Sequence, residues 1–181
     1  MAGIIVALIV IVVILVILFA VVRRRRTETS QNLRGKFGPE YDRTVKQTGS
    51  RRKAEQELQE RQERVSSLQL HALSDQQRQS FNDRWRDVQA QFVDDPPTAI
   101  GRADGLVQEV MRARGYPVGD FEQRAADVSV DHADVVNHYR TAHEIASRHE
   151  QGQANTEDLR NAMVSYRSLF EELLHTAQTT S

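Results

Sequence analysis

The sequence predicts an all-α protein, in which one N-terminal transmembrane helix precedes a soluble bundle of five or six helices. Three observations predict this fold class. Residues 4–22 are 19 consecutive residues without a polar side chain. The remainder of the chain repeats apolar residues at helical spacing. No segment shows the apolar–polar alternation of a half-buried strand.

The apolar run has the length of a membrane-spanning helix. At about 1.5 Å per residue it covers roughly 28 Å, close to the ~30 Å hydrocarbon core of a bilayer. Nothing basic precedes the run, it exceeds the usual signal-peptide core of about 7–15 residues, and no A-x-A-like site follows it. We therefore expect residues 1–26 to be an uncleaved anchor that ends in a stop-transfer cluster: Arg23, Arg24, Arg25 and Arg26.

Charge predicts the orientation of the chain. Residues 23–53 hold eleven basic and three acidic residues, a net of +8, whereas residues 54–181 hold thirteen basic and twenty-two acidic residues, a net of −9. The positive-inside rule then places the N-terminus outside and the C-terminal body in the cytoplasm. Arg23 to Arg26 are the predicted contacts to lipid headgroups.

Residues 27–50 are predicted to be a juxtamembrane linker, because three glycines and one proline interrupt them. Apolar residues nevertheless recur there at every fourth position: Leu33, Phe37, Tyr41 and Val45. They could dock on the headgroup region or on the body, or pack locally within a partly ordered linker.

Residues 51–181 are predicted to be the soluble helical domain. A first helix is expected over 51–73, with Arg61 on its apolar seam, and packing on its own domain is favoured over a short coiled-coil stalk. Ser74 and Gln77 fit a capping box that opens the next helix. Trp85 lies in the apolar stripe of that helix, which favours a core position over a ligand platform.

The later helix boundaries follow from caps and helix breakers. Starts are expected after Asp95, Asp120, Asp131 and either Asn155 or Thr156, and an end at Gly115. Gly101 and Gly105, four residues apart, are expected to allow a close helix crossing.

The sequence offers little sign of catalysis. The absence of cysteine excludes disulfides, thiolate metal sites and a cysteine nucleophile. His143-Glu144 begins like H-E-x-x-H, but Ser147 stands where the second histidine is needed. Neither a nucleophile elbow nor a P-loop is present. We expect no catalytic residue, cofactor or metal and no enzyme activity. The only basic cluster adjoins the predicted membrane segment, so nucleic-acid binding is not expected either.

Several short segments resemble a known group of proteins: Arg114-Gly115-Tyr116-Pro117, Ser129-Val130-Asp131-His132, Thr156-Glu157-Asp158-Leu159-Arg160, Tyr166-Arg167 and Leu169-Phe170. They resemble uncharacterised bacterial single-pass membrane proteins with a helical soluble part. The resemblance implies a bacterial plasma-membrane location and carries no known activity.

The sequence therefore predicts a membrane-anchored helical interaction or scaffold module, which contacts lipid through its anchor and binds a protein partner or a second copy of itself. One alternative is an exported or periplasm-facing helical protein whose apolar run is an export signal. Another is an enzyme whose site gathers carboxylates with His132, His138 or His143.

Overall fold

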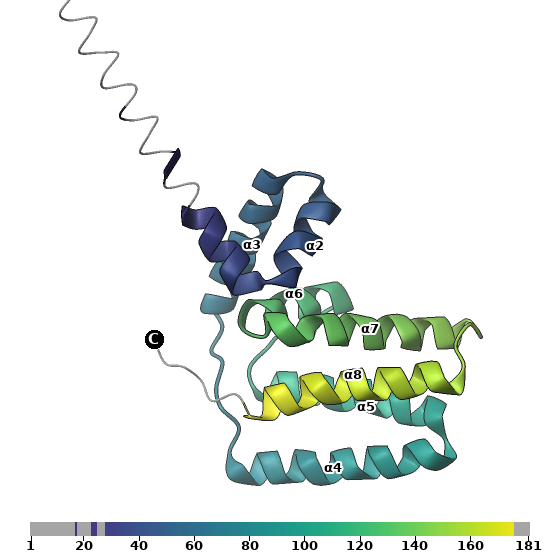
Figure 1. Ribbon diagram of the computed structural model, residues 1–181. Coiled ribbons are helices and arrows are strands. Elements are labelled where there is room, and N and C mark those ends of the chain that lie inside the picture. The colour runs from purple at the N-terminus through teal and green to yellow at the C-terminus, as the bar shows by residue number, and fades with distance from the viewer. Residues whose placement is uncertain (1–16, 18–22, 25–27, 176–181) are drawn as a thin grey trace, which may run out of the picture.

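The computed structural model describes residues 17, 23–24 and 28–175, and these residues form an all-helical protein (Figure 1). The all-α prediction is thus confirmed for the described part of the chain. The predicted membrane span, residues 4–22, lies outside it except for Ile17. Among the residues described, no helix has both the length and the apolar character needed to cross a membrane.

Residues 28–37 form a helical segment, and the described residues before it, Ile17, Arg23 and Arg24, are helical as well. Seven helices follow it: α2 (Pro39–Thr48), α3 (Arg51–Ser66), α4 (Asp75–Asp94), α5 (Pro96–Ala113), α6 (Phe121–Asp131), α7 (Ala133–Glu150) and α8 (Thr156–His175). Six of them start at or after residue 51, in agreement with the predicted five or six, whereas the helix at 28–37 and α2 are additional.

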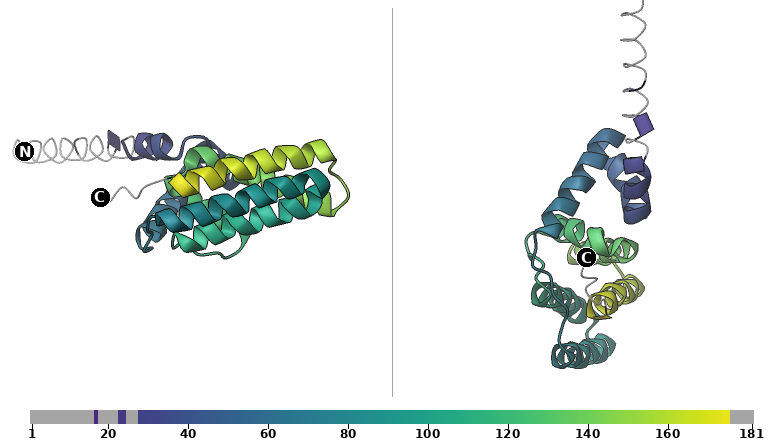
Figure 2. Two further views of the ribbon diagram at one scale, coloured as in Figure 1. Left: turned by 90° about the horizontal axis from the view of Figure 1, so that it is seen from below. Right: turned by 90° about the vertical axis from the view of Figure 1, so that its left-hand side faces the viewer.

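The helices α4, α5, α7 and α8 form the bundle (Figures 1 and 2). Within the bundle, α4 packs on α5, α5 packs on α8, and α8 packs on α7. Trp85 stacks on Phe170 with ring centroids 4.5 Å apart, and both rings are buried. Tyr139 and Tyr166 of the same core meet edge to face, with centroids 6.2 Å apart. The prediction that Trp85 is a core residue is confirmed.

Local hydrogen bonds define where the bundle helices begin. Ser74 and Gln77 form the predicted capping box, and Asp95 accepts from the backbone N–H of Thr98. Two further predicted caps are confirmed: Asp120, which accepts from the backbone N–H of Gln123, and Asn155, which accepts from that of Asp158. The predicted start after Asp131 is one residue early, because α6 ends at Asp131 and His132 separates it from α7.

The helix at 28–37, α2 and α3 form the N-terminal lobe (residues 28–66), which packs on α6 and α7. The prediction of a linker over residues 27–50 is wrong for the residues described there, because they form helices. Their four-residue apolar repeat helps to build a second core: Leu33, Phe37 and Tyr41 are buried in it with Leu58 and Val65 of α3 and Val130 of α6, and Val45 is partly buried against it. Gly38 and Gly49, with φ of 46° and 63°, make the turns between the helices, so two of the expected helix breakers separate helices without ending the fold.

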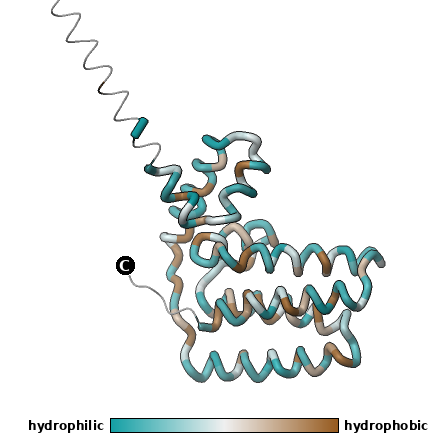
Figure 3. The backbone as a smooth tube through the Cα atoms, in the orientation of Figure 1, coloured by the Kyte–Doolittle hydropathy of each residue, from teal (hydrophilic) through white to brown (hydrophobic). Residues whose placement is uncertain are grey.

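An extended segment, residues 67–74, joins the N-terminal lobe to the bundle, so the helix predicted over 51–73 is shorter than expected. Leu68 and Leu70 contact both cores, and Figure 3 shows this apolar stretch between the two parts. The segment runs close to Gly115, where a Cβ would lie 2.5 Å from the carbonyl oxygen of Gln69. By contrast, a Cβ on Gly101 or Gly105 would meet nothing within 4 Å, so the close crossing expected there is not formed.

Candidate functional site

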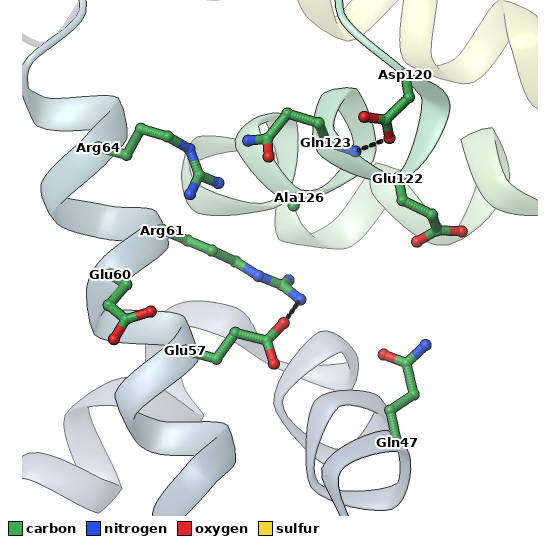
Figure 4. A pocket seen from close by; sticks show the side chains of 9 residues that line it. All are labelled: Gln47, Glu57, Glu60, Arg61, Arg64, Asp120, Glu122, Gln123 and Ala126. Carbon is green, nitrogen blue, oxygen red and sulfur yellow. Dashed lines mark hydrogen bonds and ion pairs between the residues drawn. The ribbon is translucent and has the colours of Figure 1, made fainter.

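A polar cleft of about 350 Å³ opens between α2, α3 and α6, where the N-terminal lobe meets α6 (Figure 4). Its lining is almost entirely charged or amide side chains: Gln47, Glu57, Glu60, Arg61, Arg64, Asp120, Glu122, Gln123 and Ala126. It is the candidate site because it gathers charged groups from helices far apart in the sequence.

The carboxylate of Glu40 is the centre of the charge cluster beside this cleft. Glu40 is completely buried, and its Oε1 accepts from Arg61 and from Arg140, each at 2.9 Å. Arg43 lies within 3.5 Å of the same oxygen. Because Arg61 belongs to α3 and Arg140 to α7, one carboxylate on α2 links three helices. We call these four residues the Glu40 cluster.

Further ion pairs extend the contact between lobe and bundle. Arg64 of α3 donates to Asp127 of α6 at 2.8 Å from Nε, and the Asp127 side chain is almost fully buried. Arg140 also donates to Glu122 at 2.8 Å. Within the cleft, Arg61 donates to Glu57, as Figure 4 shows.

Most of these charges are already compensated by their neighbours. The four acids of the lining outnumber its two arginines, so the cleft carries a negative surplus. Arg61 and Arg64 are each bound by carboxylates, as described above, which leaves no guanidinium ready to receive an anion. Removing a partner from a buried ion pair leaves an uncompensated charge, which costs far more than an exposed pair contributes. The arrangement therefore works chemically as a charged joint between the N-terminal lobe and the bundle.

The structure describes two of the four predicted lipid-contact residues. Arg23 and Arg24 are exposed, and the Nε of Arg24 donates to Glu28 at 3.0 Å. Arg25 and Arg26 lie outside the described residues.

The three histidines of the enzyme alternative do not share a cleft. His132 is buried, and its Nδ1 lies 3.1 Å from Glu172. Burial lowers the pKa of His132, aided by the charge of Arg114, although Glu172 opposes the shift. His143 stacks on Phe121 with centroids 3.6 Å apart, and His138 is exposed. Within the described ranges, no three histidines or acids are grouped so that they could hold a metal ion.

The Glu40 cluster was not predicted from the sequence, because residue 40 falls within the linker predicted over residues 27–50. One signal was available: Arg61 occupies the apolar seam of its helix, and an arginine is rarely buried without a carboxylate partner. Comparison of the chain with protein-family models, with curated proteins and with solved structures finds no match in any of the three.

Proposed function

We propose that this protein is a single-pass, membrane-anchored helical interaction module whose body is held close to the cytoplasmic face of a bacterial plasma membrane. The observation that carries the proposal is the position of the first packed helix. Among the described residues, packing against the body begins at Ser30, four positions after Arg26, and Ser30, Leu33 and Phe37 are all buried.

The short connection changes what the module can reach. A flexible linker over residues 27–50 would have a root-mean-square length of roughly 27 Å, from about 5–6 Å multiplied by the square root of its length. Since residues 28–37 pack in the lobe, only residues 23–27 stand in the sequence between the proposed span and packed structure. The proposed anchor would therefore hold the N-terminal lobe close to the membrane surface.

The charge of the body supports a protein partner with a basic surface. Residues 54–181 carry a net of −9, which favours encounters with cationic surfaces and disfavours a close approach to anionic lipid. In the other form of the proposal, the partner is a second copy of this chain. We treat the body as non-catalytic, since the charged side chains that it gathers serve ion pairs and helix caps.

The anchor and its orientation can be tested with single cysteines, because the native chain has none. Three variants of the full chain, Ala2→Cys, Gln59→Cys and Ser181→Cys, are labelled in intact cells with a membrane-impermeant maleimide. We expect only the Ala2→Cys variant to be labelled, and all three to remain in the membrane fraction after carbonate extraction.

A matched variant tests whether the apolar run causes membrane attachment. Val12→Arg places a charge near the middle of the run, at a cost to insertion of about 3 kcal/mol. We expect a large part of this variant to move to the carbonate-soluble fraction. Labelling at Gln59→Cys, or a native chain that carbonate extracts, would contradict the proposal. If the topology stands, crosslinking in the membrane identifies the partner.

A further inference from the structure

The fold brings a second group of basic residues to the end of the molecule at which the helix at 28–37 begins. Ser30 of that segment donates to Glu55 of α3 at 2.6 Å, and Tyr41 donates to the same oxygen at 2.8 Å. Figures 1 and 2 both show the α2–α3 turn at this end, away from the bundle. Residues separated by about 25 positions in sequence therefore lie side by side.

Four basic residues surround the α2–α3 turn: Lys46, Arg51, Arg52 and Lys53. We call them the basic tip. All four are exposed. Arg51 is paired with Glu55 at 2.9 Å, whereas no described hydrogen bond or ion pair engages the other three. The nearby acid Glu28 is paired with Arg24.

The pairing of Glu55 leaves the tip with a positive surplus. Burial acts to raise the pKa of Glu55, but hydrogen bonds from Ser30, Arg51 and Tyr41 outweigh it and lower the pKa. Glu55 is thus ionised at neutral pH and offsets Arg51 alone. Three charges, those of Lys46, Arg52 and Lys53, remain uncompensated at the tip.

Three of the four residues of the basic tip, those of α3, lie at a helix end where positive charge is unfavourable. Arg51, Arg52 and Lys53 form the first turn of α3, which contains no acidic residue, and the Ser50 side chain makes no capping hydrogen bond. The N-terminus of a helix carries partial positive charge, so cations there reduce helix stability in water. Contact with an anionic surface would offset this cost, because the surface attracts the same cations.

We propose that the basic tip is a second contact surface for anionic lipid headgroups, which acts beside Arg23 to Arg26. The inference rests on the proposed membrane anchor and deepens it. With the anchor and the tip both in contact, the N-terminal lobe is held at two points and the acidic bundle is directed away from the bilayer.

The test measures how close the tip lies to lipid. The full chain carrying Gln47→Cys, an exposed position beside Lys46, is labelled with a fluorophore and reconstituted in nanodiscs that contain a headgroup-linked nitroxide quencher. Discs of phosphatidylcholine alone are compared with discs that also contain phosphatidylglycerol. We expect quenching at residue 47 to rise about twofold with the anionic lipid, since each basic residue near such a surface adds attraction. A label at Gln151→Cys, on the α7–α8 turn, should show no rise.

Two variants with the same loss of charge separate tip contact from general attraction. Lys46→Gln, Arg52→Gln and Lys53→Gln together should abolish the rise. Arg86→Gln, Arg160→Gln and Arg167→Gln, which remove three exposed charges from the bundle, should preserve it. Raising the salt to about 1 M, where the Debye length is about 3 Å, should also remove the rise in the native chain.

The outcomes distinguish the two proposals. A chain that does not incorporate into discs of either composition would contradict the membrane anchor. A chain that incorporates into both, with equal quenching at residue 47, would leave the anchor intact and overturn the basic tip. Loss of the rise in the bundle variant alone would overturn it too.

Discussion

The bundle and the N-terminal lobe are stabilised in different ways. In the bundle, large side chains fill the interior: Trp85 stacks on Phe170, and Tyr166 lies in the same core. The lobe has a smaller apolar core, and part of its contact with α6 and α7 is made by buried charges around Glu40.

This difference determines which substitutions the bundle and the lobe each tolerate. Apolar packing is non-directional. A substitution that shortens a buried side chain lowers the free energy of unfolding roughly in proportion to the apolar area lost and to the cavity left behind. A buried ion cluster depends on every partner, because each remaining charge was desolvated on folding. The bundle should therefore respond to changes in side-chain volume, and the joint between lobe and bundle to changes in charge.

The largest expected effect is the loss of a bundle aromatic. Trp85→Ala should lower the free energy of unfolding by about 3–5 kcal/mol, since it leaves a cavity against Phe170. Chemical denaturation followed by circular dichroism measures this loss. Val93→Ala, on the same helix but 82% exposed, is the control and should change stability by less than about 0.5 kcal/mol. Equal effects would mean that the bundle is not packed as described.

The charged joint provides the second test. Glu40→Gln should cost about 3 kcal/mol, the lower part of the range for a broken buried pair, because Arg61 and Arg140 each retain another carboxylate. Amide hydrogen exchange should accelerate in residues 28–66 more than in α8. Glu57→Gln, which removes a partly exposed partner of Arg61, should cost less than about 1 kcal/mol. Uniform acceleration across the molecule would show that the joint is not a local contact.

The helix caps allow a smaller and closely matched comparison. Ser74→Ala removes the side chain that caps α4 and should cost about 1 kcal/mol. Ser50→Ala, at the start of α3, removes a side chain that makes no capping bond and should cost close to zero. Thermal unfolding of both variants measures the difference, and a larger loss for Ser50→Ala would reverse the comparison.

The smallest expected effect concerns pH, because burial and Glu172 act on His132 in opposite directions. The pKa of His132 is lower in the folded chain than its ordinary value of about 6.5, so the unfolded chain binds more protons between the two values. Stability should therefore be full above about pH 6.5 and fall as the pH decreases toward the folded pKa. His132→Asn should remove this component of the pH profile, whereas His138→Asn, at an exposed position, should keep it. Identical profiles for the native chain and His132→Asn would refute the assignment.

Sequence reasoning succeeded where the cause is local. Caps such as Ser74 and Asn155 lie three residues from their partners, and the stripe that contains Trp85 lies on one helix, so periodicity and spacing reveal them. It failed over residues 27–50, because glycines that separate helices look the same in sequence as glycines that end structure. The cleft was equally out of reach. The ion pairs in and beside it join residues 21, 63 and 100 positions apart, and no local pattern encodes such pairings.

The pairing of Glu40 with Arg140 also affects when the N-terminal lobe can finish folding during synthesis of the chain. The two residues are 100 positions apart, and chains are synthesised at about 5–20 residues per second. Roughly 5–20 seconds therefore pass between the appearance of the carboxylate and that of its partner on α7. During this interval α2 and α3 can form a hairpin, but Glu40 stays hydrated, and the lobe reaches its final packing only after α7 has been made.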